Sequence, residues 1–443
     1  MAEAGMRVEF VLRTVEERGI QFIRLWFVDV LGFLKSLAIP AAELPQAFLE
    51  GVGFDGSSID GYARVQEADM LLRPDPETFQ VLPWRPEQLV ARMFCDVLTP
   101  DGEPFPGDPR YVLKTNLARA AGLGYSFYAG PEVEFFLFSS VSKPEPLDVG
   151  TYFDLTPLDV GSEFRRRVIA YLERVGIPVK ESHHEVAASQ HEIDLQHTDA
   201  LATADGITTF RLAVKEVAQE IGYYATFMPK PVQGAWGSGM HTHFSLFEGN
   251  RNAFYGPSEG PHLSKIGQAF VAGVLRHARE MTAVTCPLVN SYKRLVPGYE
   301  APVHVSWGRG NRSALVRVPG TKPWKEEAAR IEYRALDPSA NPYLAFSAIL
   351  TAGLEGIAEG YELPPEATEN IDRLSEAERH SLGIPSLPGD LHEALEEMRR
   401  SALMRHALGG HVVDWYLANK QAEWEDYRSV VSGWELERYL PRY

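Results

Sequence analysis

Gly130–Phe138, GPEVEFFLF, places two glutamates inside an otherwise apolar run. In an extended strand, side chains two residues apart point to the same face, so Glu132 and Glu134 share one side while Val133 and Phe135 take the other. Two like charges on one buried face are costly unless a cation lies between them. The stretch therefore predicts a strand that holds something cationic against one of its faces.

Three further stretches combine an apolar face with a chemically active one. ESHHEVAASQHEIDLQH supplies Glu185 and Glu192, and GSGMHTHFSLF alternates His241, His243 and Ser245 on one side. ARIEYRALD puts Arg330, Glu332 and Arg334 on one face. Alone, a Glu-x-Glu pair also fits a solvated strand face, and a His-x-His pair also fits surface or core histidines. If the polar faces converge, they line one cavity with five carboxylates and at least one imidazole.

Such a cavity needs compensating cations. Oxygen-dominated ligation selects hard ions, so two Mg²⁺ or Mn²⁺ ions fit better than zinc. Arginines gather in the same half of the chain, and the planar, permanently charged guanidinium suits phosphate and carboxylate groups. Metals and arginines beside carboxylates predict phosphoryl transfer with an anionic co-substrate. The arginines that support this interpretation are Arg294, Arg312, Arg317, Arg330 and Arg334.

Composition narrows the class of protein. A chain of 443 residues is long for one core, and its net charge of -17 argues against a nucleic-acid partner. No apolar run approaches the roughly 20 residues of a membrane span, and MAEAGMRVEF lacks the pattern of a signal peptide. Both cysteines, Cys95 and Cys286, lie in apolar settings and are expected in the core. We therefore expect a cytoplasmic protein without a membrane partner.

The order of patterns predicts an α+β chain with two domains. A helix is expected over 8–19, followed by a hairpin that turns at Leu31-Gly32. The turn-rich TPDGEPFPGDP marks a boundary, which divides the chain into residues 1–105 and 106–443. Helical patterns follow at 161–176, 204–222, 263–284 and 341–360, and the chain is mostly helical from Gly389 onward.

Six motifs in this sequence resemble the successive signatures of the type I glutamine synthetase family. They are FDGSSIDGYARVQEADMLLRPD, GPEVEFFLF, SHHEVAASQHEID, FMPKPVQGAWGSGMHTHFSLF, VNSYKRLVPGYEAP and the pair NRSALVRVP and ARIEYRALDPSANPYL. The resemblance implies a small N-terminal β-grasp domain and a large catalytic domain, in which helices surround an antiparallel sheet that forms a partial barrel. It also implies a homo-dodecamer of two hexameric rings, with each active site between neighbouring subunits.

The resemblance assigns roles residue by residue. One metal site would be Glu134, Glu185 and Glu192, and the other Glu132, His241 and Glu332. Glutamate would bind at Trp236, Gly237, Arg294, Glu300, Arg312 and Arg334, and the nucleotide, ATP, at His243, Ser245, Arg312, Arg317 and Arg330. The ammonium or amine pocket would be Asp55, Ser58, Tyr152, Glu185 and Glu300. Asp55, Glu300 and Arg312 would be catalytic: a base from the neighbouring subunit, a closing-flap residue and a stabiliser of the transferring phosphoryl group.

Several positions depart from the family pattern. Trp236 replaces an asparagine that helps to position glutamate, and an indole cannot copy the hydrogen bonds of an amide. Lys180 stands where many members have a glutamate near ATP, and the loop that carries Trp324 is longer than usual. Arg64 resembles an arginine tied to feedback inhibition, and Asp372 replaces a tyrosine that is adenylylated in some members.

The resemblance predicts an ATP-dependent ligase that forms glutamine from glutamate and ammonia through γ-glutamyl phosphate. The alternative is a γ-glutamyl-amine ligase that uses an alkylamine or polyamine, which Trp236 could accommodate through an apolar or cation–π wall. A third possibility, a non-catalytic structural protein of this fold, would be expected to have lost metal ligands or Glu300, and both are retained.

Overall fold

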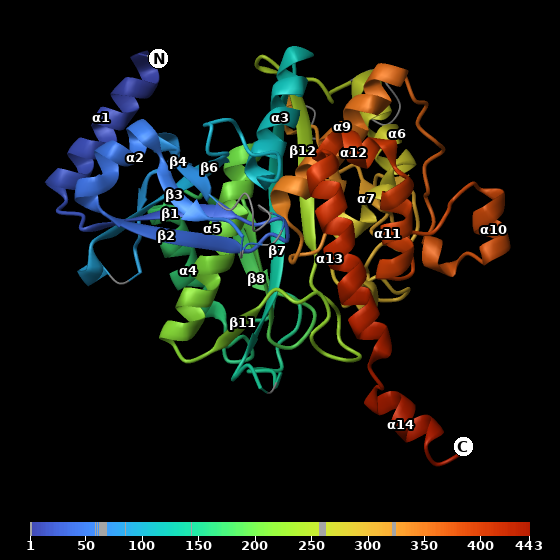
Figure 1. Ribbon diagram of the computed structural model, residues 1–443. Helices are drawn as coiled ribbons and strands as arrows, with labels where there is room; N and C mark the ends of the chain where they lie inside the picture. Colours follow the sequence, from blue (N-terminus) through green and yellow to red (C-terminus); the bar gives the residue numbers. More distant parts are fainter. Residues whose placement is uncertain are drawn as a thin grey trace.

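The computed structural model describes residues 2–57, 59, 61, 69–84, 86–142, 144–256, 263–320 and 325–443. It consists of two β-sheets with helices packed around them, as Figure 1 shows. The predicted residues Ser58, Arg64 and Trp324 lie outside the described residues. In the part of the chain that the structure describes, no helix combines the length and the apolar character that a membrane span requires.

The small N-terminal sheet has the strand order β2-β1-β6-β4-β3, with β5 paired to β6. Strands β1 and β6 run parallel, and the other pairs are antiparallel. The elements are α1 Ala2–Glu17, β1 Phe22–Val28, β2 Leu34–Pro40, η1 Ala41–Glu43, α2 Leu44–Glu50, β3 Val52–Asp55, β4 Asp69–Pro74, η3 Pro76–Thr78, β5 Gln80–Val81, η4 Pro86–Gln88 and β6 Val90–Leu98.

Alternation along β1 explains how the small sheet joins the rest of the molecule. Ile23, Leu25 and Phe27 point into a core that they share with α1 and α2. Trp26 and Val28 point to the opposite face and belong to the larger hydrophobic core, which they share with the large sheet. The small sheet is therefore buried on both faces, which fixes it against the larger domain.

The large sheet has the order β14-β15-β16-β12-β7-β9-β8, with β10 and β11 on β7 and β13 on β12. Its centre is the long strand β7, which pairs antiparallel with both β12 and β9. The strands are β7 Ser126–Phe138, β8 Val179–His184, β9 Gln190–Leu195, β10 Thr198–Asp199, β11 Tyr224–Thr226, β12 Met240–Glu248, β13 Arg251–Asn252, β14 Trp307–Gly308, β15 Val316–Arg317 and β16 Ile331–Tyr333.

Helices cover this sheet and extend the core away from the small domain (Figure 1). α9 supplies many of the buried apolar side chains, and α14 projects away from the remainder of the chain. The helices are α3 Pro109–Gly122, α4 Ser162–Arg174, α5 Ala200–Glu220, α6 Lys265–Arg276, α7 Ala278–Thr285, α8 Ser291–Arg294, η5 Glu326–Ala328, α9 Pro342–Glu359, η6 Ile371–Arg373, α10 Glu376–Ser381, α11 Leu391–Arg400, α12 Ala402–Leu408, α13 Gly410–Ser429 and α14 Gly433–Tyr439.

The α+β class, the early hairpin and the helical C-terminal part are as predicted. Cys95 and Cys286 are both buried free thiols, in agreement with their predicted core positions. Two helical patterns differ. The helix expected over 8–19 runs over Ala2–Glu17, and residues 263–284 form two helices, α6 and α7, that break at His277. The His277 ring is held between Glu280 and Glu355, 3.1 Å from each, and these contacts stabilise the break.

Candidate active site

Glu132, His241 and Glu332 come together from three neighbouring strands, and we call them the Glu132 cluster. His241 on β12 lies opposite Glu132 on β7, and β16, which carries Glu332, pairs with the other edge of β12. The Nδ1 atom of His241 is 3.9 Å from one oxygen of each glutamate. Ligand atoms of all three residues lie within 4.8 Å of one another, an arrangement that can hold a metal ion.

The carboxyl groups of this cluster are set up to be ionised. Burial alone would raise the pKa of Glu132, but the hydrogen bond and charge of His243, whose Nε2 is 2.8 Å away, lower it to about 2. The pKa of Glu332 is likewise below its usual range, because Arg334 and other nearby cations outweigh the effect of burial. Burial lowers the pKa of His241 to about 3, which keeps the imidazole neutral. Ionised carboxylates and a neutral imidazole are the forms that bind metals.

A second group contains His183, Glu185 and Glu192, and we call it the Glu185 cluster. His183 Nδ1 is 3.5 Å from Glu185 and its Nε2 is 3.3 Å from Glu192. Glu134 on β7 lies opposite Glu192 on β9, and its carboxylate accepts a hydrogen bond of 2.8 Å from Gln190. His183 was not among the residues predicted from the sequence, although it is the first residue of the HHE stretch that ends at Glu185.

Like charges accumulate in this second group. Burial and the nearby Glu185 carboxylate raise the pKa of Glu134 to about 8. Burial, together with Glu300, raises the pKa of Glu185 to about 7. The pKa of Glu192 is well above its usual range because burial and the surrounding carboxylates disfavour its charge. Without a metal, bound protons reduce the negative charge of these carboxyl groups. A divalent ion would neutralise the same charge, so the donor set fits such an ion.

Two buried arginines lie beside the clusters, at positions predicted to bind glutamate. Arg294 donates to the backbone oxygens of Ala335 and Arg334, at 2.8 and 3.1 Å. Arg334 contacts Glu332, and its Nε is a buried donor without a hydrogen-bond partner among the described residues. At Gly237 an added Cβ would lie 2.5 Å from the backbone oxygen of Pro229 and 3.0 Å from Arg294, so only glycine fits there.

Tyr152, Glu300 and Arg312 also face the Glu185 cluster. Burial and the charges of Glu185 and Glu192 raise the pKa of Tyr152, whereas Arg312 opposes this shift. Glu300 is close enough to Glu185 to contribute to the raised pKa of that residue. The φ angle of Glu300 is 58°, a left-handed conformation that is unusual for a residue other than glycine. Such strain is often stored at functional sites.

Trp236 is half-exposed and contacts the segment that carries Glu300. Its ring centroid lies 6.1 Å from that of Tyr299, with the two rings nearly perpendicular. On Tyr299, the ammonium of Lys230 lies 3.7 Å from the ring centroid. The indole thus forms an aromatic wall directly beside the predicted flap.

A cavity of about 310 Å³ opens next to the Glu132 cluster. Its lining includes Glu132, His243 and Arg330, three residues to which the sequence analysis gave metal or nucleotide roles. Ser245 lies just behind the wall and contacts His197 at 3.1 Å. Lys180 stands at the same cavity and forms an ion pair of 3.2 Å with Asp194. Arg317 contacts Glu332 from the neighbouring strand β15.

Asp55 lies in the other sheet, on the edge strand β3. Its carboxylate is exposed and accepts a hydrogen bond of 2.8 Å from the backbone nitrogen of Ser57. Hydrogen bonds from Ser57 lower the pKa of Asp55, so the group is a carboxylate at neutral pH. Within one chain, Asp55 is therefore not part of either cluster, and its use by a neighbouring subunit stays a prediction.

Comparisons with known proteins give the same family for both parts of the chain. The sequence model described as "Glutamine synthetase, beta-Grasp domain" matches residues 19–100, and "Glutamine synthetase, catalytic domain" matches residues 106–439. A glutamine synthetase of Mycolicibacterium smegmatis is 54% identical over 98% of both chains, and one of Methanosarcina mazei is 52% identical over 98% of this chain and 97% of the relative.

A solved structure described as a GmaS/ADP complex resembles the fold closely. It superposes with a TM-score of 0.88 at 34% sequence identity, covering 97% of this chain and 99% of the other. Both domains and their connection therefore match proteins of known structure along almost their whole length.

Proposed function

Since the chain belongs to the glutamine synthetase family, we propose that it is an ATP-dependent ligase that joins glutamate and ammonia to form glutamine. The observation that carries this proposal is the pair of carboxylate–histidine clusters on the strands to either side of β7, next to a cavity and two buried arginines. A ligase needs this combination, because a polyphosphate and two charged substrates must be neutralised in one place.

The clusters fit two Mg²⁺ or Mn²⁺ ions, since each offers oxygen donors and one imidazole. Glu132, His241 and Glu332 would hold one ion, and Glu134, Glu185 and Glu192, with His183 beside them, the other. When bound, the ions would neutralise the phosphates of ATP and the charge that develops during phosphoryl transfer. His243, Ser245, Arg317 and Arg330 would contact the nucleotide.

The first chemical step activates glutamate. An oxygen of its γ-carboxylate attacks the γ-phosphorus of ATP, the bond to the bridging oxygen breaks, and ADP leaves. Arg294 and Arg334, near Gly237 and Trp236, are suited to hold glutamate, and Arg312 is placed to stabilise the transferring phosphoryl group. The product is γ-glutamyl phosphate, an acyl phosphate whose leaving group is far better than the original oxygen.

The second step forms the amide. Ammonium must first lose a proton, which we assign to Asp55 of a neighbouring subunit. The nitrogen then attacks the acyl carbon, the bond from that carbon to the phosphate oxygen breaks, and the second proton leaves with the departing phosphate. Tyr152, Glu185 and Glu300 would bind the ammonium ion together with Ser58, which lies outside the described residues. The position of Glu300 next to Tyr299 and Gly298 suits a flap that keeps water from the acyl phosphate.

The use of Asp55 requires an assembly, and we propose a cytoplasmic homo-dodecamer with active sites between subunits. The exposed carboxylate of Asp55 and its place on the outer strand of the small sheet support this arrangement.

A γ-glutamyl-amine ligase is the second candidate, and the wall of Trp236 and Tyr299 favours it. An aromatic wall binds the alkyl part or the charge of an organic amine better than it binds ammonium alone. The likeness to the GmaS structures is compatible with both candidates.

Phosphate release with ATP and glutamate tests both candidates, with ammonium, methylamine, putrescine and spermidine compared as nucleophiles. We expect turnover with ammonium, its loss on removing divalent ions with EDTA, and its return with added Mg²⁺ or Mn²⁺. Glu332→Gln should abolish turnover, whereas Glu326→Gln, at an exposed position nearby, should retain it. Turnover with an organic amine and none with ammonium would replace the first candidate by the second. EDTA-resistant turnover would refute both.

A further inference from the structure

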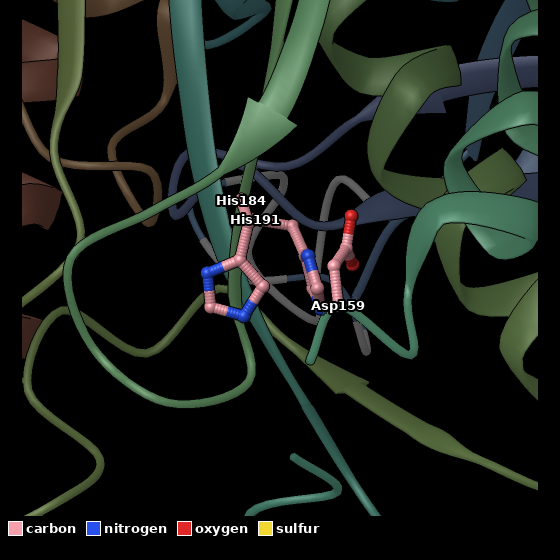
Figure 2. A group of neighbouring side chains, drawn as sticks. All are labelled: Asp159, His184 and His191. Atoms are coloured by element: carbon pink, nitrogen blue, oxygen red, sulfur yellow. The ribbon is translucent and has the colours of Figure 1, made fainter. Parts of the chain in front are cut away.

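A third group of side chains, Asp159, His184 and His191, has the composition of a metal site outside both clusters. Figure 2 shows the three side chains close together. They are 3%, 0% and 1% exposed, and one ligand atom from each lies within 4.8 Å of the others. A buried carboxylate beside two imidazoles requires a cation or a proton.

The cation is the guanidinium of Arg165. Both of its terminal nitrogens bind Asp159, with distances of 3.1 and 2.6 Å to the two oxygens. The same Nη1 atom lies 2.8 Å from Nδ1 of His191. Because guanidinium has only donors, this histidine nitrogen must accept, and it has no lone pair left for a metal. Arg165 therefore occupies the place that an ion would take.

Both ring nitrogens of His184 also have hydrogen-bond partners. Its Nδ1 donates to the backbone oxygen of Glu185 at 2.7 Å, and its Nε2 contacts Asp148 at 3.1 Å. Asp148 additionally accepts hydrogen bonds from the backbone nitrogens of Ser189 and Val160, at 2.7 and 3.2 Å. His184 thus links the backbone of a proposed metal ligand to the segment that begins at Asp148.

His184 and His191 form a cross-strand pair of β8 and β9, and the segment from 148 to 161, the 148–161 loop, rests on both. At Gly150 an added Cβ would lie 2.7 Å from Nε2 of His184. At Gly161 it would lie 2.3 Å from Cε1 of His191. One end of the loop is therefore held by His184 with Asp148, and the other by His191 with Arg165 and Asp159.

Between these two ends the loop carries Tyr152. Tyr152 and Phe153 both contact the ring of His183, with centroid distances of 5.3 and 4.7 Å. His183 in turn belongs to the Glu185 cluster. The position of Tyr152 in the proposed amine pocket thus depends on contacts buried beneath the loop, not on the exposed loop residues themselves.

We propose that Arg165 and His184 are positioning residues for the amine pocket: they clamp the two ends of the 148–161 loop and thereby fix Tyr152 against Glu185. On this proposal the Asp159–His184–His191 group is a site for a guanidinium of the chain itself and takes no metal ion. The inference rests on the proposed function, which gives Tyr152 and Glu185 their role in binding the amine.

The first test compares Arg165→Ala with Arg166→Ala, the adjacent residue on α4, whose side chain is 78% exposed. For Arg165→Ala we expect the KM for the amine substrate to rise by about tenfold or more, since a misplacement of about 1 Å can cost up to about 100-fold. In Arg165→Ala the KM for ATP should stay within about twofold of the wild-type value. In Arg166→Ala the KM for the amine and the KM for ATP should both stay within about twofold of the wild-type values. Millimolar guanidinium should restore the amine KM of Arg165→Ala, whereas urea should not.

A second variant avoids removal of the buried charge. Gly161→Ala removes no charged group but pushes one end of the loop away from His191, and it should raise the amine KM selectively as well. Equal rises in the KM for amine and ATP, or no change in either variant, would overturn the proposal. So would a bound divalent ion in the wild-type protein that His191→Ala removes, because Arg165 would then not be the cation of this group.

Hydrogen–deuterium exchange separates this inference from the proposed function. Without any substrate, amides of the 148–161 loop should exchange faster in Arg165→Ala than in the wild type or in Arg166→Ala, while those of α5 stay protected. If the wild type lacks ligase activity but shows this pattern, only the proposed function fails. If the exchange of the loop is the same in all three proteins, the clamp itself is refuted.

Discussion

The Glu185 cluster makes a prediction about stability that needs no substrate, and Glu134 is its clearest member. In the folded, metal-free protein the pKa of Glu134 is about 8, compared with an ordinary value of 4.5. The folded state therefore keeps a proton that the unfolded chain releases near pH 4.5. Because the folded state binds more protons, this carboxyl makes the free energy of unfolding fall as the pH rises towards 8.

The size of the effect follows from the shift. A difference of one pKa unit corresponds to about 1.4 kcal/mol, so full ionisation of Glu134 costs the metal-free protein about 5 kcal/mol. Between pH 5 and pH 8 the free energy of unfolding falls by a few kcal/mol, on the order of the full cost, since Glu134 is still half protonated at the upper end. Glutamine has nearly the same shape and does not ionise, so Glu134→Gln should lack this slope.

The pH dependence of the free energy of unfolding is measured by urea unfolding at a series of pH values. All measurements are made in EDTA and at one protein concentration. The free energy of unfolding of Glu134→Gln minus that of the wild type should become more positive by several kcal/mol from pH 5 to pH 8. With saturating Mg²⁺ the wild-type slope should flatten, because the ion replaces the protons. Parallel pH curves for the two metal-free proteins would show that Glu134 is ionised without a metal, and the charge argument for the cluster would be wrong.

Two further predictions concern the reaction itself. Asp55→Ala should lower the rate of amide formation by about 100-fold or more, the usual contribution of a general base, with ADP binding unchanged in calorimetry; an equal loss of both would refute its role as a proton acceptor. Trp236→Asn should raise the ratio of kcat/KM for ammonium to that for methylamine, because the amide restores hydrogen bonds and removes the aromatic wall; an unchanged ratio in steady-state assays would exclude Trp236 as the determinant of amine choice.

Local spacing in the sequence predicted which side chains share a face of a strand. Which residues of other strands lie near them was predicted only through the family resemblance. Alternation in GPEVEFFLF puts Glu132 and Glu134 on one face, and the structure agrees, because both residues lie in the extended strand β7. Local spacing carries no information on which residue of β9 or β12 lies opposite, since register depends on packing across the whole sheet. The resemblance grouped Glu134 with Glu192 and Glu132 with His241, and the fold shows the register behind this grouping, because each pair lies directly opposite on neighbouring strands.

The residues that the sequence analysis missed are those whose role depends on distant parts of the chain. His183 was visible in the letters HHE, but those letters alone do not separate a metal ligand from a core histidine. Arg165 lies in a helix whose pattern of charges looks ordinary for a surface, and it is only 6% exposed because Asp159 and His191 surround it. Helical spacing places Arg165 on the same face as Val168 and Leu172, unlike Arg166, but it does not show that Asp159 and His191 pair with its charge.

Both clusters bury negatively charged carboxyl groups, but the charge is compensated differently in each, and this difference affects metal binding. Around Glu332 the compensating charges are arginines of the chain, so the carboxylates are ionised well below neutral pH. Around Glu134 and Glu185 the compensation is protons, with pKa values of about 8 and 7. An ion at the Glu185 cluster must displace these protons, whereas one at the Glu132 cluster need not. Acidification from pH 8 to pH 6 should therefore weaken metal binding at the Glu185 cluster first, and Mn²⁺ titrations that showed both sites weakening together would contradict this assignment.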